Sequence, residues 1–289
     1  MSIRTKAEAS LVVVTAIWGS TFVVVKGALA DASPLPFLAL RFLLAGLLLL
    51  AILGRGRVDR RAILPGAILG LFLFAGYLFQ TWGLVYTTPS KSAFLTGFSV
   101  ILVPIIMMLS GVRIGAGSLL GGALGLVGIY LLVAPSGMAT VNRGDLLTLA
   151  GAFSFAVHIV LVGHYTKRFS FLHLVPAQIL VVGLLALAAL PLAPGQHLRV
   201  TGRLVLAILV TAVLATGVAF SVQNWAQQYT PAAHTALIFA LEPVFAALSS
   251  WLVVGEHFGG KALLGSGLIL AGMVVSETWG VSRPSPVEG

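Results

Sequence analysis

Long apolar runs separated by short polar breaks dominate the sequence. A helix that crosses a membrane needs about 20 mostly apolar residues. Ten runs reach that length: 8–30, 34–54, 61–83, 88–110, 116–134, 144–165, 171–192, 203–226, 232–254 and 260–279. The breaks carry helix-ending residues such as Pro194-Gly195. The pattern predicts an all-α integral membrane protein with ten transmembrane helices.

The second half of the chain repeats the first. The segment WGLVYTTPSKSAF (82–94) aligns with WAQQYTPAAHTAL (225–237) at a spacing of 143 residues. RFLLAGLLLLA, which starts at Arg41, lies over QILVVGLLALA, which starts at Gln178, at a spacing of 137. Matched tryptophan, tyrosine and apolar positions indicate an internal duplication.

The duplication predicts two five-helix repeats, 1–138 and 139–280, followed by a disordered tail over 281–289. Five helices are an odd number, so the second repeat enters the membrane from the opposite side. The expected architecture is a pair of inverted repeats around a central cavity, as in many secondary transporters.

Composition and charge agree with a membrane protein. Hydrophobic residues make up 58% of the chain and charged residues 9%, against roughly 25% charged in soluble proteins. The net charge of +9 falls in short loops, which argues against a nucleic-acid surface. With the N-terminus in the cytoplasm, the inner side holds 10 Lys and Arg residues and the outer side 6, with a cluster over 55–61. Both termini are therefore expected in the cytoplasm.

The first apolar run is expected to remain as a helix. It extends over 9–30, longer than the core of about 7–15 residues in a cleaved signal peptide. Cysteine is absent, so neither a disulfide framework nor a thiolate site exists.

An acid and a proline interrupt the ninth apolar run, LIFALEPVFAAL. A carboxylate at the bilayer centre costs about 2.5–3.5 kcal/mol on insertion scales, so Glu242 is expected to face a cavity or a partner. Pro243 removes the N–H that would bond the carbonyl of Phe239, which makes it a candidate hinge. The alternative is a neutral, hydrogen-bonded Glu242 that only packs, beside a simple kink.

Polar residues at helical spacing predict a stripe that faces the centre in each half. In the second half it contains Thr235, Glu242, Ser249 and Glu256; in the first half it contains Ser92, Thr96 and Ser99.

Other apolar runs carry single polar or aromatic side chains that could line the same cavity. The predicted substrate-binding residues are Trp18, Tyr77, Gln80, Ser99, His158, Gln223, Asn224 and Glu242. Glu242 and His158 are the candidate coupling residues. Each of these side chains could instead pack or hydrogen-bond between helices. Arg41 is expected near the outer end of its helix, where snorkelling or an acidic partner would satisfy it.

No motif indicates a cofactor or a metal site. GEHFGGKA (255–262) has the glycine spacing of a phosphate-binding loop but carries Ala262 where that loop needs Ser or Thr. The carboxylates are scattered, so metal-assisted chemistry lacks ligands. The pairs Gly66/Gly70 and Gly121/Gly125 favour close helix packing, with homodimer formation as a weaker reading.

Four stretches in order along the chain resemble the EamA-type members of the drug/metabolite transporter superfamily: IWGSTFVVVK (17–26), LRFLLAGLLLL (40–50), LEPVFAALSSWLVVGE (241–256) and GSGLILAGM (265–273). The resemblance implies a bacterial inner-membrane carrier that exports amino acids or related metabolites without ATP. Its EP and GE pairs correspond to Glu242-Pro243 and Gly255-Glu256. Where the first copy often has its own GE pair, this chain has Val112 and Arg113.

These observations favour a secondary transporter that exports amino acids or similar small metabolites by alternating access, with proton coupling as a further hypothesis. The expected partners are the substrate, the bilayer and protons, and the protein is not expected to be an enzyme. Two alternatives stay open: a membrane-embedded enzyme acting on a lipid or prenyl substrate, and a channel.

Overall fold

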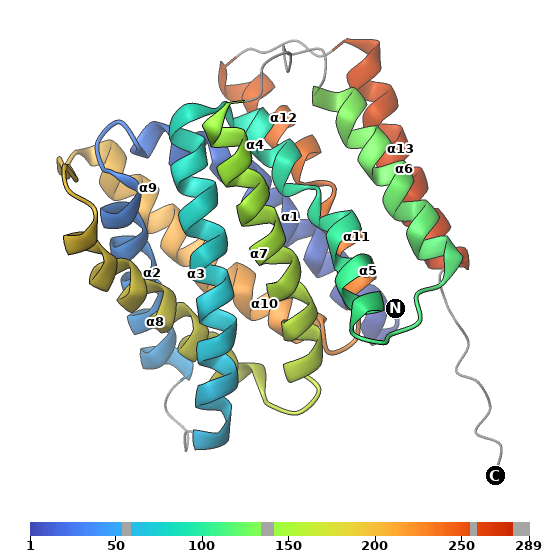
Figure 1. Ribbon diagram of the computed structural model, residues 1–289, viewed down its shortest axis with the longest axis horizontal. Helices are drawn as coiled ribbons and strands as arrows, with labels where there is room; N and C mark the ends of the chain where they lie inside the picture. Colours follow the sequence, from blue (N-terminus) through green and yellow to red (C-terminus); the bar gives the residue numbers. More distant parts are fainter. Residues whose placement is uncertain (54–58, 134–141, 255–258, 280–289) are drawn as a thin grey trace.

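The chain folds into a bundle of helices with short connections (Figure 1). The computed structural model describes residues 1–53, 59–133, 142–254 and 259–279. Over these residues it contains helices and one isolated β-bridge, between Ala32 and Leu198. The predicted all-α architecture is confirmed.

Helical segments occupy the positions of all ten predicted spans. They are α1 (Ile3–Ala28), α2 (Pro34–Leu53), η1 (Arg60–Ala62) leading into α3 (Ile63–Tyr86), α4 (Pro89–Thr96), α5 (Ser99–Leu109), α6 (Ala116–Val133), α7 (Arg143–Tyr165), α8 (Phe171–Ala189) with η3 (Leu190–Leu192), α9 (Gly202–Ala212), the π-helical turn η4 (Val213–Val218), α10 (Ala219–Ala226), α11 (Ala232–Phe239), α12 (Glu242–Val254) and α13 (Gly260–Trp279). Eight segments are long and apolar enough to cross a membrane, and the apolar parts of α6 and α13 are shorter. The fourth span is divided into α4 and α5, and the ninth into α11 and α12. The sequence features at Arg55, Arg57, Gly255-Glu256 and the tail lie outside the described residues.

Side-chain caps explain where several helices begin. The Thr88 hydroxyl accepts from the backbone N–H of Lys91 at the start of α4, and Thr201 caps α9 in the same way. At the start of α7, Asn142 and Asp145 form a reciprocal capping box. The caps satisfy donors that a helix end otherwise leaves unpaired, which matters most where water is scarce.

The main helix pairs join one half of the chain to the other. α2 packs on α8, α3 on α7, α1 on α12, and α6 on α13. The α6–α13 pair lies at one edge of the bundle in Figure 1. Its closest approach is at glycines: a Cβ added at Gly121 would lie 2.5 Å from the carbonyl oxygen of Gly272. Gly70 likewise lies against the backbone of α8, so both glycine pairs provide the predicted close packing.

A methyl group at Gly19 is expected to destabilise the protein, because α1 crosses α12 there with no spare room. The new Cβ would lie 2.6 Å from the carbonyl oxygen of Glu242 and 2.7 Å from the Cβ of Phe245. Overpacking of this kind typically costs about 1–3 kcal/mol. Gly19→Ala should therefore lower the thermal unfolding temperature of the protein in detergent.

Gly27, on the same helix, provides the matched control. A Cβ there would meet no atom within 4 Å, so Gly27→Ala should be neutral or slightly stabilising. Equal unfolding temperatures for the two variants would contradict the close α1–α12 crossing.

The bundle has two ends, which we name the N-terminal face, where α1 begins, and the opposite face, where α1 ends and α4 begins (Figure 1). On the opposite face Asp31 ties two loops together. Its carboxylate accepts hydrogen bonds of 2.8 Å each from the Thr201 hydroxyl and from Nε of Arg203. The hydrogen bond from Thr201, followed by that from Arg203, holds the pKa of Asp31 below its usual value. The loop therefore stays anchored at neutral pH.

Each face carries an ion pair at equivalent positions of the two halves. On the opposite face, Lys91 Nζ lies 2.7 Å from Asp145 Oδ2. On the N-terminal face, His234 Nε2 lies 3.6 Å from Glu8 Oε1, a contact that is an ion pair when the histidine is protonated. Lys91 and His234 are 143 residues apart, and Glu8 and Asp145 are 137 apart, the two spacings found in the sequence.

Candidate functional site

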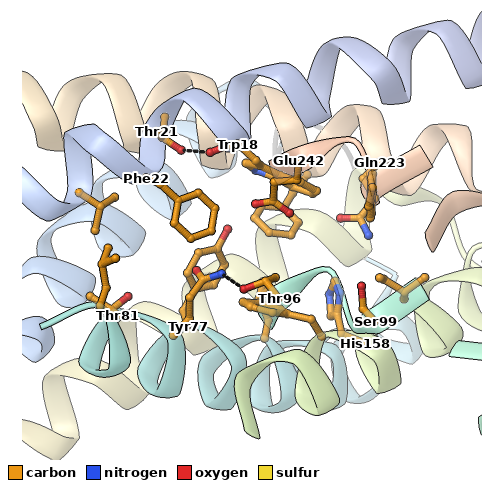
Figure 2. Close-up of a pocket in the computed structure, with 18 of the residues that line it drawn as sticks. Trp18, Thr21, Phe22, Tyr77, Thr81, Thr96, Ser99, His158, Gln223 and Glu242 are labelled. Atoms are coloured by element: carbon orange, nitrogen blue, oxygen red, sulfur yellow. Dashed lines mark hydrogen bonds between the residues drawn. The ribbon is translucent and has the colours of Figure 1, made fainter. Parts of the chain in front are cut away.

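A cavity lies between the two halves at the centre of the bundle (Figure 2). The space between its side chains, its opening included, is about 730 Å³. It is lined by Trp18, Thr21, Phe22, Val25, Arg41, Leu73, Tyr77, Gln80, Thr81, Leu84, Thr96, Ser99, Phe155, His158, Ile159, Phe220, Gln223, Phe239 and Glu242. All the predicted substrate-binding residues except Asn224 are in this set.

The two broken helices meet the cavity at their breaks. α4 ends at Thr96 and α5 begins at Ser99; α11 ends at Phe239 and α12 begins at Glu242. These four positions match in pairs at the spacing of 143, and all four line the cavity. Short helices that end inside a membrane are tolerated where their ends face a polar cavity.

Both breaks have the same backbone geometry, although only the second contains a proline. The N–H of Phe98 donates to the carbonyl of Leu95 three residues earlier, and the N–H of Leu241 donates to Ile238 in the same way. Val100 takes the place of Pro243 in the first half. The break therefore does not depend on the proline, which lies at the second position of α12, where a proline is tolerated.

Glu242 supplies the carboxylate of the cavity. Its carboxylate points into the space between α1 and α3 in Figure 2, toward the side on which Tyr77 lies. The residue is only 8% exposed, and its side chain makes no hydrogen bond or ion pair with any other described residue. The acid is therefore available to a ligand or a proton.

Neutral polar groups extend the lining on both sides of Glu242. Gln80 Nε2 donates to the Thr96 hydroxyl at 2.9 Å, and the Thr21 hydroxyl donates to the carbonyl of Trp18 at 2.8 Å (Figure 2). Gln223 Nε2 donates to Gln227 Oε1 at 3.0 Å, but the Oε1 of Gln223 is buried without a partner. A buried acceptor without a donor is costly, so it marks a place where a ligand or water can bind.

His158 belongs to a chain of buried side chains. Its Nε2 lies 2.7 Å from Gln178 Oε1, Gln178 Nε2 donates to Asn224 Oδ1 at 3.1 Å, and Asn224 Nδ2 donates to the carbonyl of Phe220. Asn224 has 0% exposure and lies behind the lining. Its predicted contact with substrate is therefore not available in this structure, because the amide is used to hold Gln178 in place.

Arg41 lines the cavity, which the sequence analysis did not expect. The residue is 2% exposed, and no carboxylate among the described residues pairs with it. Its Nε donates instead to the Thr216 hydroxyl at 2.9 Å. The expectation of snorkelling or an acidic partner was wrong, because packing turns the side chain inward.

Aromatic rings form most of the remaining wall. Trp18 packs against Phe220 and Phe239 with ring centroids 5.3 and 5.1 Å apart. Its indole N–H donates to the carbonyl oxygen of Ala215 in the π-helical turn η4, at 2.8 Å. Tyr77 contacts Phe155 edge to face, with centroids 5.2 Å apart. Trp18 and Tyr77 therefore both pack and line the cavity.

The predicted polar stripes are only partly brought to the centre. In the second half Glu242 lines the cavity, whereas Thr235 is fully buried elsewhere and Ser249 donates to the hydroxyl of Ser20. The break between α11 and α12 interrupts the helical period, so a spacing of seven does not keep one face. Glu256 lies outside the described residues.

Most of the lining comes in equivalent pairs. At the spacing of 137 these are Trp18/Phe155, Thr21/His158 and Phe22/Ile159; at 143 they are Tyr77/Phe220, Gln80/Gln223, Thr96/Phe239 and Ser99/Glu242. The lining also contains Phe155, Phe220, Phe239 and Arg41, which were not among the predicted substrate-binding residues. The two spacings, extended from Trp18, Tyr77 and Thr96, lead to the three phenylalanines.

The cavity is not symmetric between the two faces. Val25 and Leu84, near the opposite face, line it. Their equivalents Val162 and Gln227, near the N-terminal face, lie outside the lining. There the amide of Gln227 donates to the carbonyl of Ile159 at 2.9 Å. The cavity thus extends further toward the opposite face.

Comparison with known proteins identifies the family. The EamA-like transporter family matches the chain twice, over residues 5–134 and 142–278. An uncharacterized transporter of Archaeoglobus fulgidus is 36% identical over 274 residues, which cover 94% of this chain and 86% of the relative. A probable amino-acid metabolite efflux pump of Escherichia coli is 26% identical over 287 residues, which cover 96% of this chain and 95% of the relative.

The fold is also found among solved structures. A crystal structure with 20% sequence identity superposes with a TM-score of 0.77, covering 94% of this chain and 97% of the other. The family and the names of these relatives indicate a transporter rather than an enzyme. The chain belongs to the EamA-like transporter family and is a multi-pass membrane protein of the transporter class.

Proposed function

We propose that this protein is a secondary transporter that exports amino acids or related small metabolites by alternating access, with protons as the coupling ion. The observation that carries the proposal is the central cavity, whose lining comes in equivalent pairs from the two halves and contains the unpaired Glu242. Substrate sites of inverted-repeat transporters lie at such an interface near the bilayer centre.

Several features support inverted repeats over 1–138 and 139–280. The helix breaks, the cavity lining and the ion pairs of the two faces all recur at the two sequence spacings. The two family matches divide the chain in the same place. Equivalent ion pairs occur on opposite faces, as an inversion requires.

The asymmetry of the cavity supports alternating access. In an inverted repeat, exchanging the conformations of the two halves closes one end of a cavity and opens the other. Leu84 lines the cavity while Gln227, its equivalent, closes the other end by bonding to Ile159. With the N-terminus in the cytoplasm, as the Lys and Arg bias favours, the cavity extends toward the outside of the inner membrane.

The function is tested by counterflow in proteoliposomes that contain the purified full-length protein. The vesicles are loaded with unlabelled amino acids, and each labelled amino acid is offered outside. Transient accumulation of a label above equilibrium is expected for an alternating-access carrier. No accumulation of any amino acid by folded protein would exclude this substrate class, and flux at channel rates without stimulation from the far side would favour a channel.

Alternating access itself can be followed with single cysteines, because the natural chain has none. Leu84→Cys and Gln227→Cys place a thiol at equivalent positions near the two faces. Saturating substrate is expected to change their labelling by a membrane-impermeant maleimide in opposite directions, since the two ends cannot be open together. Parallel changes at both sites would contradict the mechanism, and Val200→Cys, exposed in the loop before α9, serves as the control for general reactivity.

A further inference from the structure

Arg41 is a buried cation held only by neutral groups. Besides the bond from Nε to Thr216, its Nη2 lies 3.5 Å from both the Tyr77 hydroxyl and the carbonyl oxygen of Ala215. Its guanidinium carbon lies 4.8 Å from the ring centroid of Tyr77 and 5.0 Å from that of Phe42. Ring faces and a hydroxyl orient a guanidinium, but they supply no counter-charge.

The binding partner that this arrangement lacks is an anion. A guanidinium stays charged in proteins and carries five N–H donors in a fixed plane. A buried charge is normally paired or coordinated, and the planar fork fits a carboxylate with two parallel hydrogen bonds. Since Arg41 lines the cavity and no described carboxylate pairs with it, the cavity itself is where that anion can bind.

Glu242 supplies an acid to the same cavity, and it too is unpaired. The structure contains no ion pair between Glu242 and Arg41, although both line the same space. The lining therefore offers one anchor for a negative group and a separate anchor for a positive group. An ammonium is the natural partner of the carboxylate, because charge-assisted hydrogen bonds are roughly twice as strong as neutral ones.

The surfaces around these two anchors are aromatic. Trp18, Phe155, Phe220 and Phe239 line the cavity together with Tyr77, which also contacts Arg41. Such rings bind a large apolar group by burial and by edge or face contacts. The cavity thus combines a cation, an acid and an apolar wall.

We propose that the substrate is a zwitterionic α-amino acid with a large apolar or aromatic side chain. Arg41, oriented by Thr216 and Tyr77, binds its carboxylate, and Glu242 binds its ammonium group. This assignment rests on the proposed transport function and makes Arg41 a specificity-determining residue of the site.

Three probes of the same shape separate the two anchors. L-Phenylalanine carries both charges, 2-phenylethylamine lacks the carboxylate, and 3-phenylpropionate lacks the ammonium group. Each competes with labelled phenylalanine for the purified full-length protein. The unmodified protein is expected to prefer phenylalanine over either analogue by about tenfold or more, since losing a charged contact leaves its partner buried and unpaired.

Substitution of each anchor should remove one preference and keep the other. In Arg41→Gln the preference for phenylalanine over 2-phenylethylamine should fall to near one, while that over 3-phenylpropionate remains. Glu242→Gln should give the reverse pattern. A general loss of affinity from a disturbed fold would not produce this crossed result.

Arg203→Gln provides the matched control, because it removes an arginine whose side chain is 59% exposed and leaves the cavity untouched. It should keep both preferences. If Arg41→Gln does not fold, the preferences of Glu242→Gln and of the unmodified protein still test whether the cavity binds a zwitterionic amino acid.

Two results would overturn the proposal: unmodified protein that binds either analogue as tightly as phenylalanine, or both cavity variants with unchanged preferences. If phenylalanine shows counterflow but both cavity variants keep their preferences, only the roles of Arg41 and Glu242 are overturned. Counterflow of another metabolite without any amino acid would overturn the amino-acid function as well.

Discussion

Replacing Glu242 by glutamine is expected to abolish the acceleration of substrate transport by an imposed pH gradient. Glu242 is the acid among the lining residues, and no described residue competes for its carboxylate. Glutamine has nearly the same shape but cannot take up or release a proton. Uptake into proteoliposomes with and without a pH gradient, compared with gradient-free counterflow, measures the effect. The affinity for substrate should also fall by about tenfold or more, since a hydrogen bond to a charged group contributes about 1.5–3 kcal/mol.

Ser99→Ala is the matched control for this experiment. Ser99 occupies the equivalent position at the start of α5 and also lines the cavity, but it carries no charge. Its variant should keep the response to the gradient. His158→Gln tests the second candidate proton carrier; a smaller loss is expected there, because the imidazole is already bonded to Gln178. A Glu242→Gln variant that responds to the gradient like the unmodified protein would rule out Glu242 as the coupling group.

Asp145→Asn is expected to cause a large loss of stability. The side chain of Asp145 is 3% exposed and pairs with Lys91 at 2.7 Å. It also accepts from the Thr87 hydroxyl at 3.0 Å and from the backbone N–H of Asn142 at 2.8 Å. Breaking a fully buried ion pair costs about 3–5 kcal/mol; because Lys91 is 15% exposed, a loss of about 3 kcal/mol or less is expected here. Because the pair connects α4 to the start of α7, thermal unfolding in detergent should begin at a clearly lower temperature.

The equivalent substitution in the other half, Glu8→Gln, gives the comparison. The side chain of Glu8 is 21% exposed, against 3% for Asp145, and it lies 2.8 Å from Arg4, itself 37% exposed, and 3.6 Å from His234. The expected loss is about 1 kcal/mol or less. Thr230, the equivalent of Thr87, has a buried hydroxyl without a partner, so the second network is also less complete. If Glu8→Gln destabilised the protein as much as Asp145→Asn, burial would not be what distinguishes the two pairs.

The positions of the helices could be predicted from the sequence because they depend on local chemistry. A run such as 171–192 has few polar side chains, so it is more stable in lipid than in water. In lipid its backbone N–H and C=O groups must bond to each other, which a helix achieves. The same reasoning marked Glu242 as an inward-facing group, since an isolated charge in lipid is costly. The two spacings of 137 and 143 identify equivalent positions in the two halves from the sequence alone.

The cavity lining depended on contacts that no local pattern contains. Arg41 was expected near the outer end of its helix, satisfied by snorkelling or by an acidic partner, yet Thr216 of a distant π-helical turn holds it inside. Asn224 was expected in the lining, yet its amide is used by Gln178. In each example the direction of a side chain is set by a partner more than 40 residues away in the chain.

By itself, the sequence determined the all-α class, the apolar spans, the duplicated pattern and the inward position of Glu242, because hydrophobic burial acts on each segment independently of its neighbours. Only the tertiary structure decided which polar groups meet. A helix break shifts the phase of every residue after it, as between Phe239 and Glu242. Packing of the helices then decides which side chains face the cavity, and it leaves Thr235 and Ser249 outside the lining. Because the lining comes from both halves, its complete set of residues could be identified only from the tertiary structure.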